Sequence, residues 1–410
     1  MTVIECFEHD PIDNIATCLS LLPCKLVLIG EPEDLDATVE RYRAVIKRRH
    51  LPITVEPKAV CRDDINEAVE IIAAVIKTGD ECVIDLSGGD GVVLAAAGVA
   101  YERYKDRYPV TLQRIDAVSG VVEDCDGDGE TEALSSPKVT VGELVALYGG
   151  SVKKDSQPSE ELDVNAIAPL WNAVIRDATQ WNRRVGALLE IERAAGVQRD
   201  DLCVEVDFGV VRAAIADYPD KRQRFDALIR DLEQCGVIAV ASRAEGSFRY
   251  KYKTLFLRQC LSKEGNVLEY KTLFEARSLR KDGRRVFSDA RMGVNIDWDG
   301  VIHRPVPGGV KDTKNEIDVM LMRGLTPVFI SCKNGDIKEV ELYKLHTVAA
   351  RFGGERARKM LIATDFCPDS ADVTMSLAQR AADMGILFVP NAAALTPQGW
   401  QDTFFKLIDE

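Results

Sequence analysis

The sequence has 410 residues, 46% of them apolar, which is enough for two or three domains with buried cores. Its 66 acidic and 52 basic residues give a net charge of −14, which excludes a surface coated with nucleic acid. The eleven cysteines and four histidines form no zinc-binding pattern, and cysteines in apolar runs are typical of a reducing compartment. The sequence has neither a signal-peptide pattern nor a membrane span, so we predict a cytoplasmic protein with no membrane partner.

The first 150 residues alternate between strand-like and helix-like segments. Residues 25–30 and 81–86 are apolar runs of strand length, and residues 34–49 and 63–78 have helical periodicity. The run at 81–86 is followed by a glycine turn, residues 87–91, and then by an alanine-rich helix. This alternation predicts a doubly wound parallel sheet. The glycine turn offers backbone N–H groups to a phosphate, although such a turn more often simply joins a strand to a helix.

We predict two domain boundaries, near residues 160 and 245. The polar residues 149–161 indicate a domain end, and two long helical stretches follow at 166–196 and 208–236. We therefore predict a first domain over 1–160, a helical connecting region over 161–245 and a second α/β domain over 246–410.

Residues 243–291 differ from the rest of the chain in charge. They contain thirteen Lys or Arg against six Asp or Glu, with seven aromatic residues interleaved. This mixture suits a nucleic-acid strand, whose phosphates need cations and whose unpaired bases stack on rings. The alternative, which composition leaves equally open, is a solvated face over a core of aromatic side chains.

A carboxylate and a lysine stand out in the last third. Asp318 lies in the strand-like run 315–322, and Lys333 follows the next such run, 326–332. On a hairpin of this length the two side chains can face each other. Carboxylates hold Mn²⁺ or Mg²⁺, a bound cation activates water for phosphodiester hydrolysis, and a lysine stabilises the developing charge. The alternative is a buried Asp–Lys ion pair in a sheet with no catalytic role.

The spacing resembles the core of PD-(D/E)xK nucleases. Residues 315–319, 330–335, 341–345 and 352–354 resemble the nuclease domain of CRISPR-associated CARF nucleases, and residues 291–298 resemble its preceding strand. In that family a CARF domain binds a cyclic oligoadenylate made by type III CRISPR complexes, and binding activates a metal-dependent nuclease. The resemblance implies a homodimer with the messenger held across two CARF domains.

The resemblance implies two sets of site residues. The expected catalytic residues are Asp318, Lys333, Ser331, Glu269 and Glu341, with Mn²⁺ or Mg²⁺ held by Asp318, Glu269 and the backbone carbonyl of Cys332. The expected messenger-binding residues are His9, Asp13, Asn14, Ser87, Gly88, Gly89 and Asp90. Ser331 departs from the family, which often has a carboxylate there. Asp90 and Gly91 likewise stand where Thr and Lys often follow the glycines.

Together these features predict a Rossmann-like CARF domain and a restriction-endonuclease-like α/β domain, joined by a helical linker. The expected function is a nuclease activated by a cyclic oligoadenylate, taken as the tetramer, that cleaves DNA or RNA and favours single strands. Two alternatives are a ligand-responsive DNA-binding regulator that uses residues 166–245, and an enzyme that degrades the cyclic oligoadenylate itself. The ring size, the nucleic acid and the preferred metal stay open.

Overall fold

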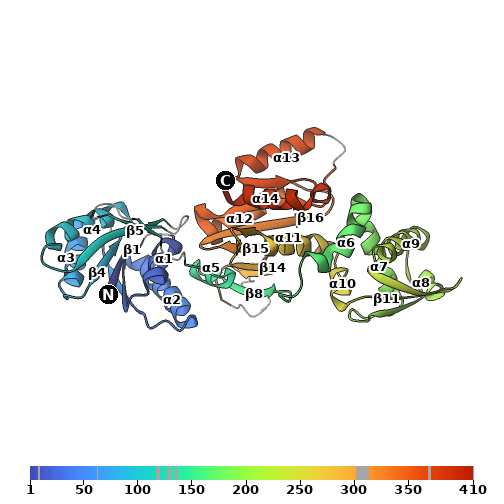
Figure 1. Ribbon diagram of the computed structural model, residues 1–410, viewed down its shortest axis with the longest axis horizontal. Helices are drawn as coiled ribbons and strands as arrows, with labels where there is room; N and C mark the ends of the chain where they lie inside the picture. Colours follow the sequence, from blue (N-terminus) through green and yellow to red (C-terminus); the bar gives the residue numbers. More distant parts are fainter. Residues whose placement is uncertain are drawn as a thin grey trace, which may run out of the picture.

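The structure is a computed structural model of the whole chain. It describes residues 1–7, 10–61, 63–116, 121–125, 127, 131–133, 137–301, 314–367 and 371–409. Figure 1 shows an elongated molecule in which the C-terminal sheet lies between the first domain and the middle region of the chain. The order of the three parts in space therefore differs from their order in the sequence.

The first domain is built around a seven-stranded sheet in the order β3-β2-β1-β4-β5-β6-β7. Its strands are β1 (Thr2–Cys6), β2 (Lys25–Gly30), β3 (Thr54–Ala59), β4 (Cys82–Asp85), β5 (Val110–Asp116), β6 (Val121–Asp124) and β7 (Thr131–Ala133). The first five are parallel, and β6 and β7 are antiparallel. One face is covered by α1 (Pro11–Leu21) and α2 (Pro32–Arg48), the other by α3 (Ile65–Ile76) and α4 (Gly91–Tyr104). This is the doubly wound arrangement that we predicted.

The central strands are apolar on both faces because helices cover both. In β2, Val27 and Ile29 pack beneath α3 and α4, whereas Leu26 and Leu28 pack beneath α1 and α2. After β4 the chain makes its glycine turn, and Asp90 then caps α4 by accepting a hydrogen bond from the N–H of Val92 at 2.8 Å. The turn is thus placed at the carboxyl edge of the parallel sheet.

The middle region combines helices with a three-stranded antiparallel sheet in the order β10-β11-β9. Its elements are α6 (Val164–Arg176), η1 (Ala178–Gln180), α7 (Trp181–Ala194), β9 (Cys203–Asp207), α8 (Phe208–Ala214), α9 (Tyr218–Gln234), β10 (Ile238–Arg243), β11 (Ser247–Tyr252) and α10 (Leu255–Cys260). We expected a helical connecting region between residues 161 and 245, and the structure adds these strands to it. In β9 only Val204 and Val206 are buried, and so short an alternation is hard to recognise between long helical stretches.

The third sheet has six strands in the order β18-β17-β16-β15-β14-β8. They are β8 (Ser151–Ser156), β14 (Asp289–Asp297), β15 (Lys314–Arg323), β16 (Thr326–Lys333), β17 (Arg358–Ala363) and β18 (Ile386–Val389). Helices α11 (Asn266–Ser278) and α14 (Pro397–Asp409) pack on one face, and α5 (Val141–Leu147), α12 (Val340–Gly353) and α13 (Ala371–Asp383) pack on the other. The remaining short elements are β12 (Arg280–Lys281), β13 (Arg284–Arg285), η2 (Gly354–Arg356) and η3 (Ala392–Ala394).

The first domain and the third sheet share one apolar core. It runs from the α1 and α2 face of the first sheet through α5 to the α12 face of the third. Strand β8 pairs with β14, so residues 151–156 belong to the third sheet although we assigned them to the first domain. Arg49, the C-cap residue of α2, also donates two hydrogen bonds of 2.7 Å to the carboxylate of Glu143 in α5. In the described part of the chain, no helix has the length and apolar character of a membrane span.

Strand β14 changes face at Gly293. Ala290 and Met292 pack in the core beneath α11, whereas Val294 and Ile296 pack in the core on the opposite face. Gly293 makes this switch with a φ of +57°, in the left-handed region that favours glycine. Its neighbouring residues pair with Val319 and Ile317 of β15, so Gly293 stands opposite Asp318. The backbone distortion therefore lies directly beside the predicted catalytic carboxylate.

We predict that Gly293→Ala lowers the free energy of unfolding by about 1–2 kcal/mol, because a left-handed backbone conformation costs alanine this much energy relative to glycine. An added Cβ meets nothing closer than Glu316 Oε1 at 4.0 Å, so the cost comes from the backbone and not from a clash. Gly293→Asn should cost less, since asparagine tolerates the left-handed region better. Urea denaturation of the three proteins measures both effects, and equal midpoints would contradict this account.

Candidate functional site

Asp318 lies where β15 and β16 separate. The pairing of β15 with β16 ends at Val319 and Ile330. Beyond that pair, Ser331 and Cys332 of β16 donate hydrogen bonds to the Asp318 side chain. Its Oδ2 accepts a hydrogen bond from the N–H of Cys332 at 2.7 Å and one from the hydroxyl of Ser331 at 3.2 Å. Burial raises the pKa of Asp318 above its ordinary value, although Lys333 and the Cys332 N–H act in the opposite direction. The carboxylate is thus fixed in place and poorly solvated.

Lys333 lies between two carboxylates. Its Nζ is 4.0 Å from Asp318 Oδ2 and 3.1 Å from Glu341 Oε2. Burial acts to lower the pKa of Lys333, but Asp318 and Glu341 outweigh it, and the pKa is raised. Lys333 is therefore a cation that can stabilise negative charge, and it is not a general base. Glu341 also forms an ion pair with Lys344 of α12, whose Nζ lies 2.8 Å from Glu341 Oε1.

Glu269 of α11 reaches the same place from the other side of the strands. It is 4% exposed, and burial, followed by the charge of Asp318, raises its pKa to about 7. Lys263 opposes this shift, with its Nζ 3.5 Å from Glu269 Oε1 and 3.7 Å from Glu316 Oε1. Two poorly solvated carboxyl groups therefore repel each other, and each has a lysine beside it, Lys333 next to Asp318 and Lys263 next to Glu269. Sequence reasoning did not single out Lys263, because it is one of many cations in its segment.

The donors fit a cation that keeps most of its water. In the ranges that the structure describes, no three His, Cys, Asp or Glu side chains gather as an all-protein metal cage. Asp318 and Glu269 are two mutually repelling carboxylates, and Mg²⁺ and Mn²⁺ sites often use one or two carboxylates plus waters and a substrate phosphate. The Cys332 thiol contacts the Thr272 hydroxyl at 3.8 Å, so the backbone is the part of Cys332 left for this site.

A small cavity of about 80 Å³ opens beside these groups. It brings together Asp318, Ser331, Lys333 and Glu341, four of the five predicted catalytic residues. Glu269 does not line this cavity, and its link to Asp318 is the electrostatic repulsion that raises its pKa. The alternative of a plain Asp–Lys ion pair does not account for Glu269, because a second buried carboxyl beside Asp318 destabilises the fold. Such an arrangement is typical of a functional site.

The predicted messenger site is a glycine turn closely packed on α1. A Cβ at Gly88 would lie 3.1 Å from the Cβ of Asp13 and 3.5 Å from Nδ2 of Asn14, so these segments are in contact. Gly89 has a φ of +132°, and its Cβ would lie 2.5 Å from that of Cys6, so only glycine fits there. Ser87 donates to Asp85 at 2.7 Å and accepts from the N–H of Ile115 at 2.6 Å.

Asn14 is buried behind the glycine turn. It is 1% exposed, and its amide nitrogen donates to Glu5 at 2.9 Å and to the carbonyl of Cys6 at 3.0 Å. Its amide nitrogen is therefore bonded inside the first domain, while its Oδ1 has no hydrogen-bond partner among the described residues. The Asp90 carboxylate accepts from a helix N–H, which is a structural role. His9 lies outside the described residues.

Asp13 is joined to the third sheet by an arginine that the sequence did not single out. Arg356 of η2 pairs with Asp13, and with Asp10 at 2.9 Å. Tyr148 donates to Asp10 at 3.0 Å, and these residues line a cavity of about 500 Å³ together with Arg351. Burial raises the pKa of Asp13 to about 6, although Arg356 acts to lower it.

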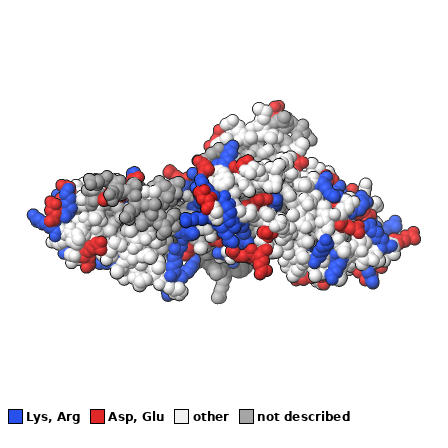
Figure 2. Space-filling view, in the orientation of Figure 1, with Lys and Arg blue, Asp and Glu red and all other residues white. Residues whose placement is uncertain are grey.

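The basic and aromatic segment 243–291 does not form the expected stacking surface. Of its seven aromatic residues, Phe248, Tyr250, Tyr252, Phe274 and Phe287 are buried. The other two, Phe256 and Tyr270, pack against the same core. Many of its cations are paired with acidic side chains, and Figure 2 shows both charges interspersed over the end of the molecule that holds the middle region. The alternative of charges over an aromatic core is correct.

We predict that Glu269→Gln stabilises the protein at pH 8, on the order of 2 kcal/mol, because the variant removes a buried charge. The folded pKa of about 7 lies above the ordinary glutamate pKa of 4.5, so the wild type loses stability relative to the variant as pH rises from about 4.5 to 7. The difference should vanish near pH 4. Thermal unfolding at several pH values measures it, with the exposed Glu245→Gln as the control. A pH-independent difference would contradict the assigned pKa.

Comparison with known proteins supports the fold. The chain matches no protein-family model and no curated protein. Among solved structures it is similar to protein VC1899 from Vibrio cholerae, with a TM-score of 0.70, 17% identity, and coverage of 100% of this chain and 97% of that one. Can2 from Sulfobacillus thermosulfidooxidans, solved in complex with cyclic tetra-adenylate, has a TM-score of 0.65 and 17% identity over 100% of this chain and 99% of its own.

A third structure, of a type III CRISPR defence DNA nuclease activated by cyclic oligoadenylate, has a TM-score of 0.52 and 15% identity. The match covers 90% of this chain but 46% of that nuclease. At these identities the similarity establishes the fold. The predicted fold class is thereby confirmed, and so is the resemblance to CARF nucleases at the level of the fold.

Proposed function

We propose that this protein is a metal-dependent nuclease activated by a cyclic oligoadenylate, acting in type III CRISPR defence. The observation that carries the proposal is a cavity at the end of two strands that Asp318, Lys333 and Glu341 line together. The buried Glu269 interacts electrostatically with Asp318. The fold shared with a cyclic tetra-adenylate complex and with an activated DNA nuclease supports it. The activator is taken as the tetramer, and the substrate as DNA or RNA.

Each residue of the site has a distinct role in this proposal. Asp318 and Glu269 hold Mg²⁺ or Mn²⁺, which when bound offsets phosphate charge and polarises a water. Lys333 stabilises the negative charge that develops on the phosphate. Ser331 stands where a carboxylate is usual, and its hydroxyl steadies Asp318 at 3.2 Å. The site thus has one negative charge fewer than a site with a carboxylate at position 331.

The activator is proposed to lie against the first domain. Gly88 and Gly89 place backbone N–H groups at the carboxyl edge of the sheet, where phosphates of anionic ligands bind in doubly wound folds. Asp13 lies against this turn. We propose a homodimer in which two such edges hold one cyclic oligoadenylate.

Helix α12 is proposed to connect the two sites. Glu341 in its first turn pairs with Lys333, and Arg356, just beyond its last residue, pairs with Asp13 and Asp10. A helix of 14 residues is a rod about 20 Å long. A ligand that draws Asp13 away from Arg356 would move this rod and shift Glu341 from Lys333. Such coupling requires that the ligand bind one arrangement more tightly than the other.

We predict that Lys333→Ala lowers the rate of activated cleavage by about 100-fold or more, because it removes the cation next to the reacting phosphate. Lys344→Ala is the matched control, since Lys344 contacts the same Glu341 but is 63% exposed. Cleavage of labelled single-stranded DNA, RNA and plasmid with Mn²⁺ or Mg²⁺ and each cyclic oligoadenylate measures the effect. An equal loss in both variants would contradict the role of Lys333.

A second candidate function rests on the middle region. Its order α7-β9-α8-α9-β10-β11, two helices after a strand and then a hairpin, is typical of winged-helix domains, which many DNA-binding regulators use. If the wild type binds DNA in a messenger-dependent way but never cleaves with Mn²⁺, the regulator is correct and the nuclease is not. Chromatography of the messenger after incubation tests whether the first domain degrades it.

We predict that Arg356→Ala raises cleavage in the absence of the messenger by about 5-fold or more and reduces the further activation that the messenger produces. The reason is that the variant breaks the ion pairs that hold the resting arrangement of α12. Arg351→Ala removes the same charge from the same cavity without breaking an ion pair seen between described residues, so it is the control. An unchanged ratio of activated to basal cleavage in Arg356→Ala would disprove the coupling.

A further inference from the structure

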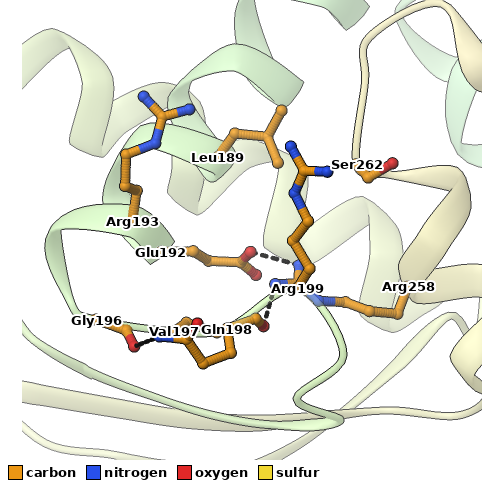
Figure 3. Close-up of a pocket in the computed structure, with 9 residues that line it drawn as sticks. All are labelled: Leu189, Glu192, Arg193, Gly196, Val197, Gln198, Arg199, Arg258 and Ser262. Carbon is orange, nitrogen blue, oxygen red and sulfur yellow. Dashed lines mark hydrogen bonds and ion pairs between the residues drawn. The ribbon is translucent and has the colours of Figure 1, made fainter.

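A cavity of about 310 Å³ lies in the middle region, outside the sites described above (Figure 3). It is formed by the end of α7, the turn that follows it and α10 with its C-terminal loop. Its lining residues are Leu189, Glu192, Arg193, Gly196, Val197, Gln198, Arg199, Arg258 and Ser262. Three of them are arginines and one is acidic, so the cavity is positively charged.

The one acidic residue is already neutralised inside the protein. Glu192 is 2% exposed, and its carboxylate accepts hydrogen bonds from Tyr250, from Tyr252 at 2.8 Å and from Arg258. Arg258 is itself 4% exposed, and its Nε has no hydrogen-bond partner in the described structure. Arg258 thus neutralises the single charge of Glu192 at the back of the cavity, together with the hydrogen bonds of two tyrosine hydroxyls.

The other two arginines stand at the opening. Arg193 and Arg199 are exposed, and within the described ranges neither makes an ion pair. In Figure 3 their guanidinium groups point to the same side of the cavity, with Leu189 between them and Ser262 across from Arg193. Guanidinium groups only donate hydrogen bonds, and their fork of N–H groups matches the oxygens of a phosphate. The cavity therefore suits an anion of phosphate chemistry.

The cavity adjoins the candidate nuclease site. Ser262 lines the cavity, and the next residue, Lys263, contacts Glu269 and Glu316. The two places are also tied together through the residue after Lys333. Asn182 of α7 donates to the Asn334 carbonyl at 2.9 Å, and Asn334 donates to the Glu264 carbonyl at 3.0 Å. The start of α7 is thus fixed against the strand end that holds Lys333, and the same helix carries the arginine cavity at its other end.

We propose that this cavity binds a backbone phosphate of the nucleic-acid strand whose neighbouring segment lies at Asp318 and Lys333. This inference rests on the proposed nuclease function and adds a binding site to it. Arg193 and Arg199 contact the phosphate oxygens, and Arg258 closes the back of the cavity. The contact positions the strand without reading its sequence, because a phosphate is the same in every nucleotide.

The test is a double variant, Arg193→Ala with Arg199→Ala. Arg258 is left intact, because its loss would leave Glu192 buried without a cation. The control is Arg48→Ala with Arg107→Ala, which removes the same charge from exposed positions of the first domain. Binding of a fluorescent oligothymidylate is measured without divalent metal at several salt concentrations. We expect about 10-fold weaker binding and a salt slope smaller by about 0.7 for each lost phosphate contact in the double variant only.

Equal melting temperatures of the wild type and both double variants establish that the fold is intact. A double variant that binds as tightly as the control overturns the inference, and so does a wild type that binds no oligonucleotide. These outcomes do not depend on cleavage, because no metal is present. Loss of the proposed nuclease function is detected separately, by an unchanged cleavage rate in Lys333→Ala. In the cleavage assay the double variant should raise KM and leave kcat within about 3-fold.

Discussion

The structure depends above all on the electrostatic repulsion between two buried carboxyl groups, Asp318 and Glu269, near the end of β15 and β16. Neighbouring carboxylates out of water repel each other, and each raises the free energy of ionising the other. Lys333 and Lys263 offset part of this repulsion. Stability alone gives no reason to keep such a pair, whereas the proposed site for a divalent cation would use it. Proteins commonly give up some stability at functional sites in this way.

The other parts of the molecule are arranged around that pair. One apolar core extends from the first domain through α5 to the α12 face of the third sheet, so the first domain cannot move without affecting that face. Helix α12 has an ion pair near each end, Glu341 with Lys333 and Arg356 with Asp13. On the opposite face, α11 supplies Glu269, and the middle region meets the same strand end through Asn182 and Asn334. The centre of the molecule is therefore in contact with both outer parts (Figure 1).

Two kinds of polar contact have different consequences for this protein. Exposed ion pairs, such as Arg249 with Glu205, contribute little to stability because water screens them. The buried group of Glu192, Arg258, Tyr250 and Tyr252 is different, since removing one member leaves the others without a partner. That group supports the cavity in which Arg193 and Arg199 lie. The structural and the proposed binding roles of the middle region thus fall on separate arginines.

The sequence by itself determined the doubly wound first domain, the second α/β domain and the pairing of Asp318 with Lys333. These follow from local apolar periodicity and from a spacing of 15 residues along one hairpin. Only the tertiary structure decided that the aromatic residues of 243–291 are core, that β8 joins the third sheet and that Arg356 meets Asp13. The last two side chains are 343 residues apart, and no local pattern encodes a contact over such a distance. Burial and pairing of charged side chains are set by elements from across the chain, so they appear only when the chain is folded.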